Sequence, residues 1–119
     1  MLSRPCEDSA EIFVLLPEGR LDARAAPDLE QALTALEERN LNQIVVDLGK
    51  SRYISSSCLR LLLIHLRKLK QAGGDLKLCS LPDKVAKVLR IAGLDALFEI
   101  YPTVEQAARA FPDYPQEHG

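Results

Sequence analysis

Gln-Ile-Val-Val-Asp-Leu at residues 43–48 is the stretch that decides the class of fold. Its apolar, β-branched residues stand on consecutive positions, which is typical of a strand buried on both faces of a parallel sheet. A second stretch, Tyr-Ile-Ser-Ser-Ser-Cys-Leu at residues 53–59, joins this strand to an amphipathic helix that runs to about Gln71. Parallel strands need a long crossover connection, which is usually a helix. Together the two stretches predict an α/β domain.

Outside these stretches, predicted strands and helices alternate along the chain. We expect strands at 11–16, 43–48, 75–80 and 97–101, with another short strand within 2–8. Helices are expected at about 27–40, from just after the serines at 55–57 to about 71, at 82–93 and at 103–111. Right-handed crossovers then give a mixed sheet of four or five strands, with about four helices mostly on one face. Residues 1–111 are expected to form this single domain, and residues 112–119 a loose tail.

Composition and charge exclude several classes of function. The chain has 119 residues and a formal net charge of −2, and its fifteen basic residues are scattered along the sequence. No stripe of Lys and Arg is evident, so we do not expect a nucleic acid as partner. No apolar run approaches the roughly 20 residues that span a bilayer, and the N-terminus lacks the apolar core of a signal peptide. We therefore expect a cytoplasmic protein without direct membrane insertion.

Residues that carry metal or catalytic chemistry are few. Cys6, Cys58 and Cys79 are odd in number and lack Cys-x-x-Cys spacing, which predicts free thiols in a reducing compartment. His65 stands mid-helix, where a structural role is favoured, and His118 stands in the tail. Neither has a ligand partner at metal-binding spacing. Gly-rich phosphate loops and Gly-x-Ser-x-Gly motifs do not occur. We expect no enzyme, no metal and no cofactor.

Ser55, Ser56 and Ser57 mark the site that stands out. A serine at a helix start caps the helix by accepting a hydrogen bond from a free backbone N–H group, and one serine suffices. A helix N-terminus is also where a phosphate is best tolerated. The residues alone favour capping and leave a phosphate switch open. Cys58 lies where a thiol can be activated, but no base is evident nearby, which favours a packed thiol.

The helix expected after the serines, which runs to about residue 71, has apolar residues on two sides. Its core stripe consists of Leu59, Leu62, Leu63, Leu66 and Leu69. Leu61 and Ile64 fall off this stripe at 100° per residue, so a neighbouring helix or a partner must cover them. We expect Leu61 to be partly exposed near Ser56. We expect adjacent helices of the same domain to cover Ile64 rather than Leu61.

Four motifs in the same order resemble the STAS domain family, the anti-sigma-factor antagonists. They are EGRLD at 18–22 with AAPDL at 25–29, IVVDL at 44–48 with YISSSCL at 53–59, GGDLKL at 73–78, and VAKVL at 85–89 with AGLDALF at 92–98. The similarity runs from about residue 11 to residue 110. The resemblance implies that residues 1–111 form one STAS domain, with 112–119 as its tail.

The resemblance also implies a function and a site. The family's phosphorylated serine falls on Ser56, its second serine on Ser57, and the acidic residue near the site on Asp22. The unphosphorylated form is then expected to bind a serine-kinase anti-sigma factor and free a sigma factor. The kinase phosphorylates the antagonist with ATP, and a serine phosphatase resets it. The expected partner-binding surface is Asp22, Ser56, Ser57, Arg60 and Leu61.

The sequence departs from the family pattern at three positions. Ser55 replaces the Asp before the acceptor, Cys58 replaces the Gly after the second serine, and Arg60 replaces a small residue. These departures favour a second hypothesis, a STAS adaptor without phosphorylation in a signalling scaffold or a transporter-associated complex. The retained Ser56 and Asp22 favour the phosphoswitch.

Overall fold

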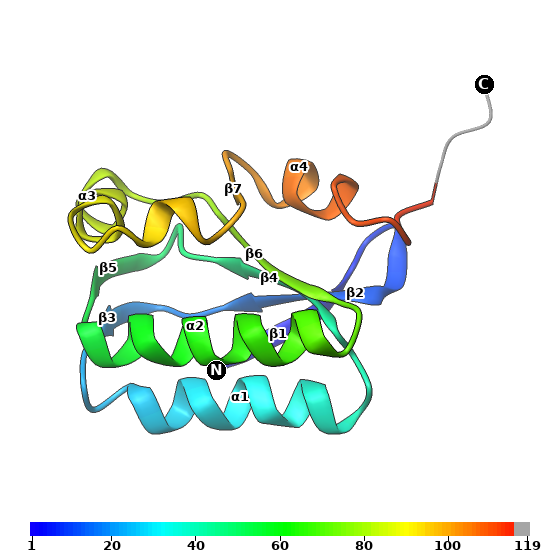
Figure 1. Cartoon of the computed structure of the whole chain (residues 1–119), viewed down its shortest axis with the longest axis horizontal. Helices are drawn as coiled ribbons and strands as arrows, with labels where there is room; N and C mark the ends of the chain where they lie inside the picture. The colour runs from blue at the N-terminus through cyan, green and yellow to red at the C-terminus, as the bar shows by residue number, and fades with distance from the viewer. Residues whose placement is uncertain (116–119) are drawn as a thin grey trace.

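A five-stranded mixed sheet forms the middle of the molecule in the computed structural model, which describes residues 1–115 (Figure 1). The strands, in spatial order, are β1 (Leu2–Cys6), β2 (Ser9–Leu16), β4 (Gln43–Asp47), β6 (Asp75–Cys79) and β7 (Ile100–Tyr101). The β1–β2 hairpin is antiparallel, and the other neighbours pair in parallel. The predicted mixed sheet is confirmed.

The central strand β4 is buried on both faces, as its apolar run predicts. Ile44 and Val46 belong to the larger core cluster, and Val45 belongs to the smaller one on the opposite face. All three side chains are fully buried. In register, Val45 stands beside Val14 of β2 and Lys77 of β6. Two layers of helices are therefore needed to cover the sheet.

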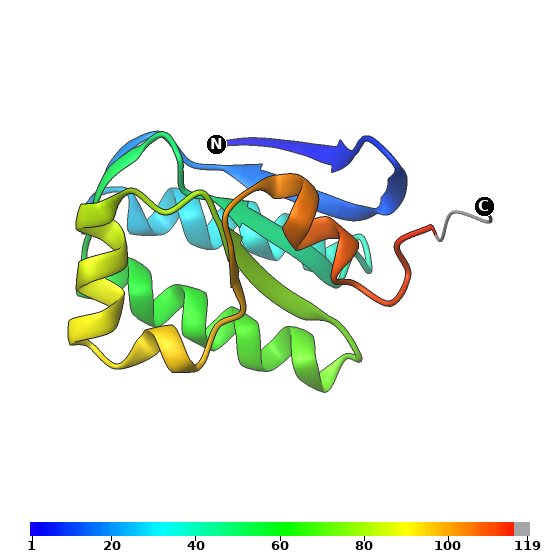
Figure 2. The same ribbon diagram turned by 90° about the horizontal axis from the view of Figure 1, so that it is seen from above.

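The helices lie mostly on one face. Helices α1 (Ala26–Glu38) and α2 (Ser56–Gln71) run side by side below the sheet in Figure 1, and α4 (Val104–Arg109) lies above it. Figure 2 shows the same layers from above, with α3 (Asp83–Ile91) at one end. The apolar stripes of α1, α2 and α3 enter the larger core cluster, while α4 contributes to the smaller one. The predicted arrangement of four helices within residues 1–115 is confirmed.

A second, two-stranded ribbon was not predicted. It pairs β3 (Gly19–Leu21) in parallel with β5 (Ser51–Ile54) beside α3. β3 has three residues and β5 has four, at or below the shortest run in which alternation can be recognised, and the pairing joins residues about thirty positions apart. The ribbon extends the domain beyond the end of β4 and leads directly into α2.

The strand expected at 97–101 is shorter in the structure. A 3₁₀ turn, η1 (Leu94–Ala96), precedes it, and the backbone N–H groups of Leu97 and Phe98 both donate to the carbonyl of Leu94. Those N–H groups are therefore engaged in the turn and not in the sheet. Only Ile100 and Tyr101 pair with β6.

The chain after residue 111 makes contacts as far as it is described. The Gln43 side chain donates to the Asp113 carboxylate at 2.6 Å, and the Tyr114 hydroxyl donates to Asp8. Residues 116–119, which include His118, lie outside the described residues. A loose tail at 112–119 stays a prediction.

His65 joins α2 to α1. The ring is fully buried, and its Nε2 lies 2.8 Å from a Glu30 carboxylate oxygen while its Nδ1 contacts the Glu37 carboxylate. The two ring nitrogens thus link α2 to two carboxylates of α1. The bond from His65 lowers the pKa of Glu30. Because α2 follows Ser55 and begins with Ser56 and Ser57, this contact fixes the helix that presents them.

Replacing His65 with Leu should lower the free energy of unfolding by about 2–3 kcal/mol at neutral pH, because two carboxylates lose a buried donor. The lowered pKa of Glu30 means that its stabilisation is present above the unfolded pKa, near 4.5, and is lost as the pH falls through the folded pKa. Urea unfolding at several pH values measures both effects. The difference in unfolding free energy between wild type and His65→Leu should become smaller below pH 4.5. A difference in unfolding free energy that becomes larger in acid would contradict this stabilising role of His65.

Candidate functional site

Ser55 caps the start of α2. Its side chain accepts a hydrogen bond from the Cys58 backbone N–H at 3.2 Å, and its backbone is extended, as expected for a capping residue. Its own N–H donates to the carbonyl of Leu21 at 2.8 Å, which ties the cap to β3. The capping predicted for the serine cluster is therefore performed by the first of the three residues.

Ser56 and Ser57, the first two residues of α2, are exposed. Neither hydroxyl forms a hydrogen bond with any described residue, in contrast to that of Ser55. The structure thus separates two roles that the sequence left together. One serine holds the helix end, and the next two present hydroxyl groups to solvent beside the positive end of the helix dipole.

Asp22 lies next to the first turn of α2 through its backbone. Its carbonyl oxygen accepts the Cys58 thiol at 3.4 Å. Its carboxylate accepts the backbone N–H groups of Arg24 at 3.0 Å and of Ala25 at 3.3 Å. The carboxylate therefore stabilises the turn that leads into α1, while the loop as a whole borders the serines.

Cys58 is a packed thiol, as the sequence favoured. The side chain is fully buried, and burial raises the pKa of the thiol, which opposes formation of a thiolate. All three cysteines, Cys6, Cys58 and Cys79, are free within the described chain. A nucleophilic role for Cys58 has no support in this geometry.

Leu61 agrees with expectation in its exposure, and Ile64 differs. Leu61 is partly exposed, as predicted, but it also packs against the larger core cluster. Ile64, for which packing by adjacent helices was expected, is instead 40% exposed. The spacing of 100° per residue placed both residues off the core stripe of the helix. It does not show which of the two sides of α2 faces α1. Arg60 is exposed between the serines and Ile64.

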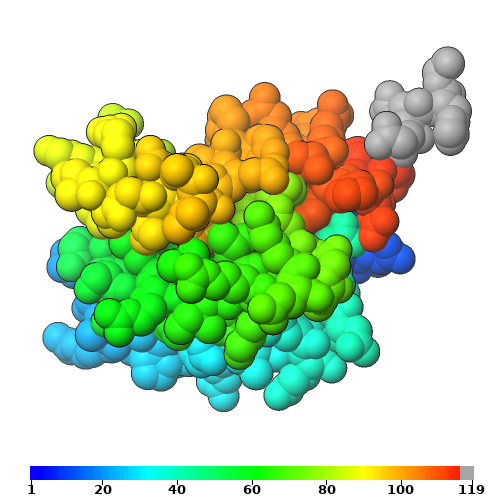
Figure 3. Space-filling model, in the orientation of Figure 1, coloured from blue at the N-terminus to red at the C-terminus, as the bar shows by residue number. Residues whose placement is uncertain are grey.

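The predicted surface residues gather at one end of α2. Asp22, Ser56, Ser57 and Arg60 surround its first turn, and Leu61 lies farther along toward α1. Figure 3 shows α2 in green across the middle of one face, between α1 and the α3 region. The sequence missed Arg20 and Tyr53, whose side chains stack at 4.5 Å on the ribbon that leads into the site. Only the pairing of β3 with β5 brings them together.

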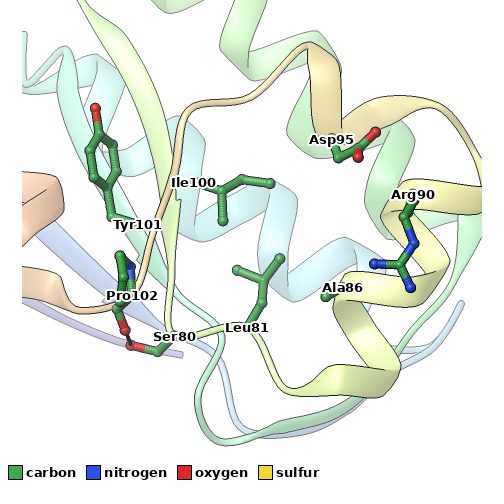
Figure 4. A pocket seen from close by; sticks show the side chains of 8 residues that line it. All are labelled: Ser80, Leu81, Ala86, Arg90, Asp95, Ile100, Tyr101 and Pro102. Carbon is green, nitrogen blue, oxygen red and sulfur yellow. Dashed lines mark hydrogen bonds between the residues drawn. The ribbon is translucent and has the colours of Figure 1, made fainter.

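A hollow of about 560 Å³ opens elsewhere, between α3, the end of β6 and β7 (Figure 4). Its lining consists of Ser80, Leu81, Ala86, Arg90, Asp95, Ile100, Tyr101 and Pro102. The lining mixes apolar side chains with one basic and one acidic residue, and it contains neither cysteine nor histidine. We assign no chemistry to it.

Within residues 1–115, no group of three or more His, Cys, Asp or Glu side chains is placed to hold a metal ion. Across the same residues, no helix is both long enough and apolar enough to cross a membrane.

Comparison with known proteins identifies a family. The family model for the STAS domain matches residues 5–107. The Bordetella bronchiseptica protein BtrV, which is assigned by name as an anti-sigma factor antagonist, is 36% identical over 94 residues, which are 79% of this chain and 81% of that protein. Both matches include the serines at the start of α2.

Solved structures agree in fold. The crystal structure of an anti-sigma factor antagonist from Mycobacterium paratuberculosis has a TM-score of 0.82 at 27% identity, covering 94% of this chain and 92% of that one. The phosphorylated form of the Bacillus cell fate determinant SpoIIAA has a TM-score of 0.68 at 20% identity, covering 91% and 97%. The second likeness is in the fold alone.

The separate roles of the serines can be tested by stability. Ser55→Ala should lower the free energy of unfolding by about 1 kcal/mol, because the Cys58 N–H loses its acceptor. Ser56→Ala is the matched control and should leave the free energy within about 0.5 kcal/mol of wild type. Urea unfolding followed by circular dichroism measures both. A larger loss in Ser56→Ala than in Ser55→Ala would mean that the cap is assigned to the wrong residue.

Proposed function

This chain belongs to the STAS domain family, and we propose that it is an anti-sigma factor antagonist whose binding is switched off by phosphorylation of Ser56. In this proposal, the unmodified protein binds a serine-kinase anti-sigma factor in the cytoplasm, and the sigma factor is released. The protein acts by binding and not by catalysis. A serine phosphatase returns it to the binding form.

The observation that carries the proposal is the free hydroxyl of Ser56 at a helix start that another serine already caps. A kinase can reach this exposed group without opening the fold. Since Ser55 accepts the capping hydrogen bond, the Cys58 N–H keeps its acceptor when Ser56 is modified. The relative named as an anti-sigma factor antagonist supports binding of an anti-sigma factor by this chain.

The chemical step is a phosphoryl transfer from ATP held by the kinase. Ser56 Oγ attacks the γ-phosphorus, and a new bond forms between these two atoms. The bond from the γ-phosphorus to the β,γ-bridging oxygen breaks, and ADP leaves with its electron pair. The hydroxyl proton passes to a base on the kinase. This chain supplies only the positioned hydroxyl.

The added phosphate changes the surface and not the fold. It carries a charge of about −1.5 to −2 at neutral pH. The free N–H groups and dipole at the start of α2 stabilise such a charge. A partner that packs on the same surface would have to desolvate the phosphate, which weakens binding.

A second candidate function rests on the departures from the family pattern. Arg60 and Cys58 replace small residues of the family beside Ser56, and Arg60 adds exposed bulk where a kinase must approach. A STAS adaptor that binds its partner without phosphorylation would use the same surface. The two candidates differ in whether Ser56 accepts phosphate.

Incubation with ATP and each purified anti-sigma factor of the source genome should add one phosphate to this protein, located on Ser56 by peptide mass spectrometry. Ser56→Ala should abolish the adduct, while Ser57→Ala should keep it. Ser56→Asp should weaken binding at least about tenfold, with a change in unfolding free energy below about 1 kcal/mol.

Phosphate on Ser55 or Ser57 would overturn the assignment of Ser56. Binding without any phosphate transfer would favour the adaptor. If no anti-sigma factor binds, the proposed function is wrong.

A further inference from the structure

Four arginines are carried by the segments that meet at the start of α2, and we propose that they dock an acidic surface of the anti-sigma factor. This arginine patch consists of Arg20, Arg24, Arg52 and Arg60. The inference rests on the proposed function and adds the chemistry of the partner's surface to it. The four residues are scattered in the sequence because the pairing that joins their segments is not local, and all four are exposed.

The β3–β5 ribbon assembles one side of the patch. Arg20 of β3 pairs with Tyr53 of β5, and its guanidinium stacks on the tyrosine ring at 4.5 Å. Arg52 precedes Tyr53, and an Nη atom of Arg52 lies 3.8 Å from the position that a Cβ on Gly19 would take. The two guanidinium groups are therefore carried by adjacent strands.

The loop before α1 and the first turn of α2 supply the other side. Arg24 follows Asp22, whose carbonyl is bonded to the Cys58 thiol in that first turn. Arg60 stands one turn after Ser56 on α2. Since Ser55 donates its N–H to the Leu21 carbonyl of β3, the ribbon, the loop and the helix start adjoin one another.

The charge of this surface is not balanced within the described chain. None of the four arginines forms an ion pair with a described residue. Of the two acidic residues within 17–25 and 50–60, Glu18 pairs with Lys50 at 3.6 Å, and Asp22 accepts two backbone N–H groups. Residues 17–25 and 50–60 contain five basic and two acidic side chains, against ten and fifteen in the rest of the chain.

An excess of positive charge on a protein whose net charge is −2 favours an acidic partner at this surface. Guanidinium groups bind carboxylates in a bidentate manner and are more weakly hydrated than ammonium groups, so they are suited to an interface. Tyr53, which is 38% exposed among them, adds the aromatic contact that frequently anchors such interfaces. Because the patch spans two strands, a loop and a helix, it fits an extended surface and not a small anion.

The patch also explains how one phosphate can act as a switch. A phosphate on Ser56 would lie within the same positive surface, where it can pair with nearby arginines. It would then occupy the groups that bind the partner's carboxylates and repel those carboxylates as well. Competition for the arginines and like-charge repulsion act in the same direction.

The test compares charge reversal inside and outside the patch. The double variant Arg52→Glu with Arg60→Glu should bind the anti-sigma factor at least about tenfold more weakly than wild type at low salt. Arg67→Glu is the matched control, since Arg67 is exposed on the same face of α2, about 10 Å farther along the helix. It should change affinity less than about twofold. Titration calorimetry at about 0.05 M and about 0.5 M salt should show the loss shrinking as charges are screened.

A second arm uses a probe that needs no partner. Hexaglutamate peptide, added to isotope-labelled protein, should shift the amide signals of residues 20–24 and 52–60 and leave those of the double variant unchanged. The charge-neutral pair Arg52→Gln with Arg60→Gln gives the same comparison if the reversed variant does not fold. Peptide shifts mapped elsewhere would overturn the inference.

The outcomes separate this inference from the proposed function. If the anti-sigma factor binds wild type and both double variants equally, the arginine patch is wrong and the proposed function stands. If no anti-sigma factor binds wild type, both are wrong. Tighter binding of a single-stranded DNA oligonucleotide than of hexaglutamate, lost in the double variants, would replace the acidic protein partner with a nucleic acid.

Discussion

The burial of β4 on both faces is the constraint on which the rest of the structure depends. Since neither face of this strand can meet water, α1 and α2 must cover one side of the sheet and α4 the other. The parallel order then places the ends of β2 and β4 at the same edge. The short β3–β5 ribbon and the start of α2 follow at that edge. The position of the serines therefore depends on the packing of the sheet.

At that edge, one hydrogen bond sets what the serines can do. Ser55 stands where the family pattern has an aspartate, and its hydroxyl accepts the Cys58 N–H. The cap is preserved by a neutral residue, so this surface has one carboxylate fewer than the family pattern. Together with Arg60, the replacement leaves the surround of Ser56 more positive. The departures that argued against a phosphoswitch therefore also describe a site that attracts negative charge.

The sequence predicted the main sheet and helices because their signals are local. The apolar run at 43–48 and the leucine stripe of α2 each define an element within one window. The β3–β5 ribbon and the gathering of Arg20, Arg24, Arg52 and Arg60 depend on pairing between distant segments, which no window contains. The exposure of Ile64 depended on which side α1 packs, and that contact is made through His65. Ser56 itself came from the resemblance, and its exposure came from the structure.

The most direct measurement compares the affinity of one anti-sigma factor for two forms of this protein, unmodified and carrying phosphoserine at position 56. Phosphoserine inserted during translation gives a homogeneous sample and does not depend on a kinase. The account predicts tight binding of the unmodified form and a loss of at least about a hundredfold with the phosphate, while the melting temperature stays the same. Equal affinity of the two forms would contradict it.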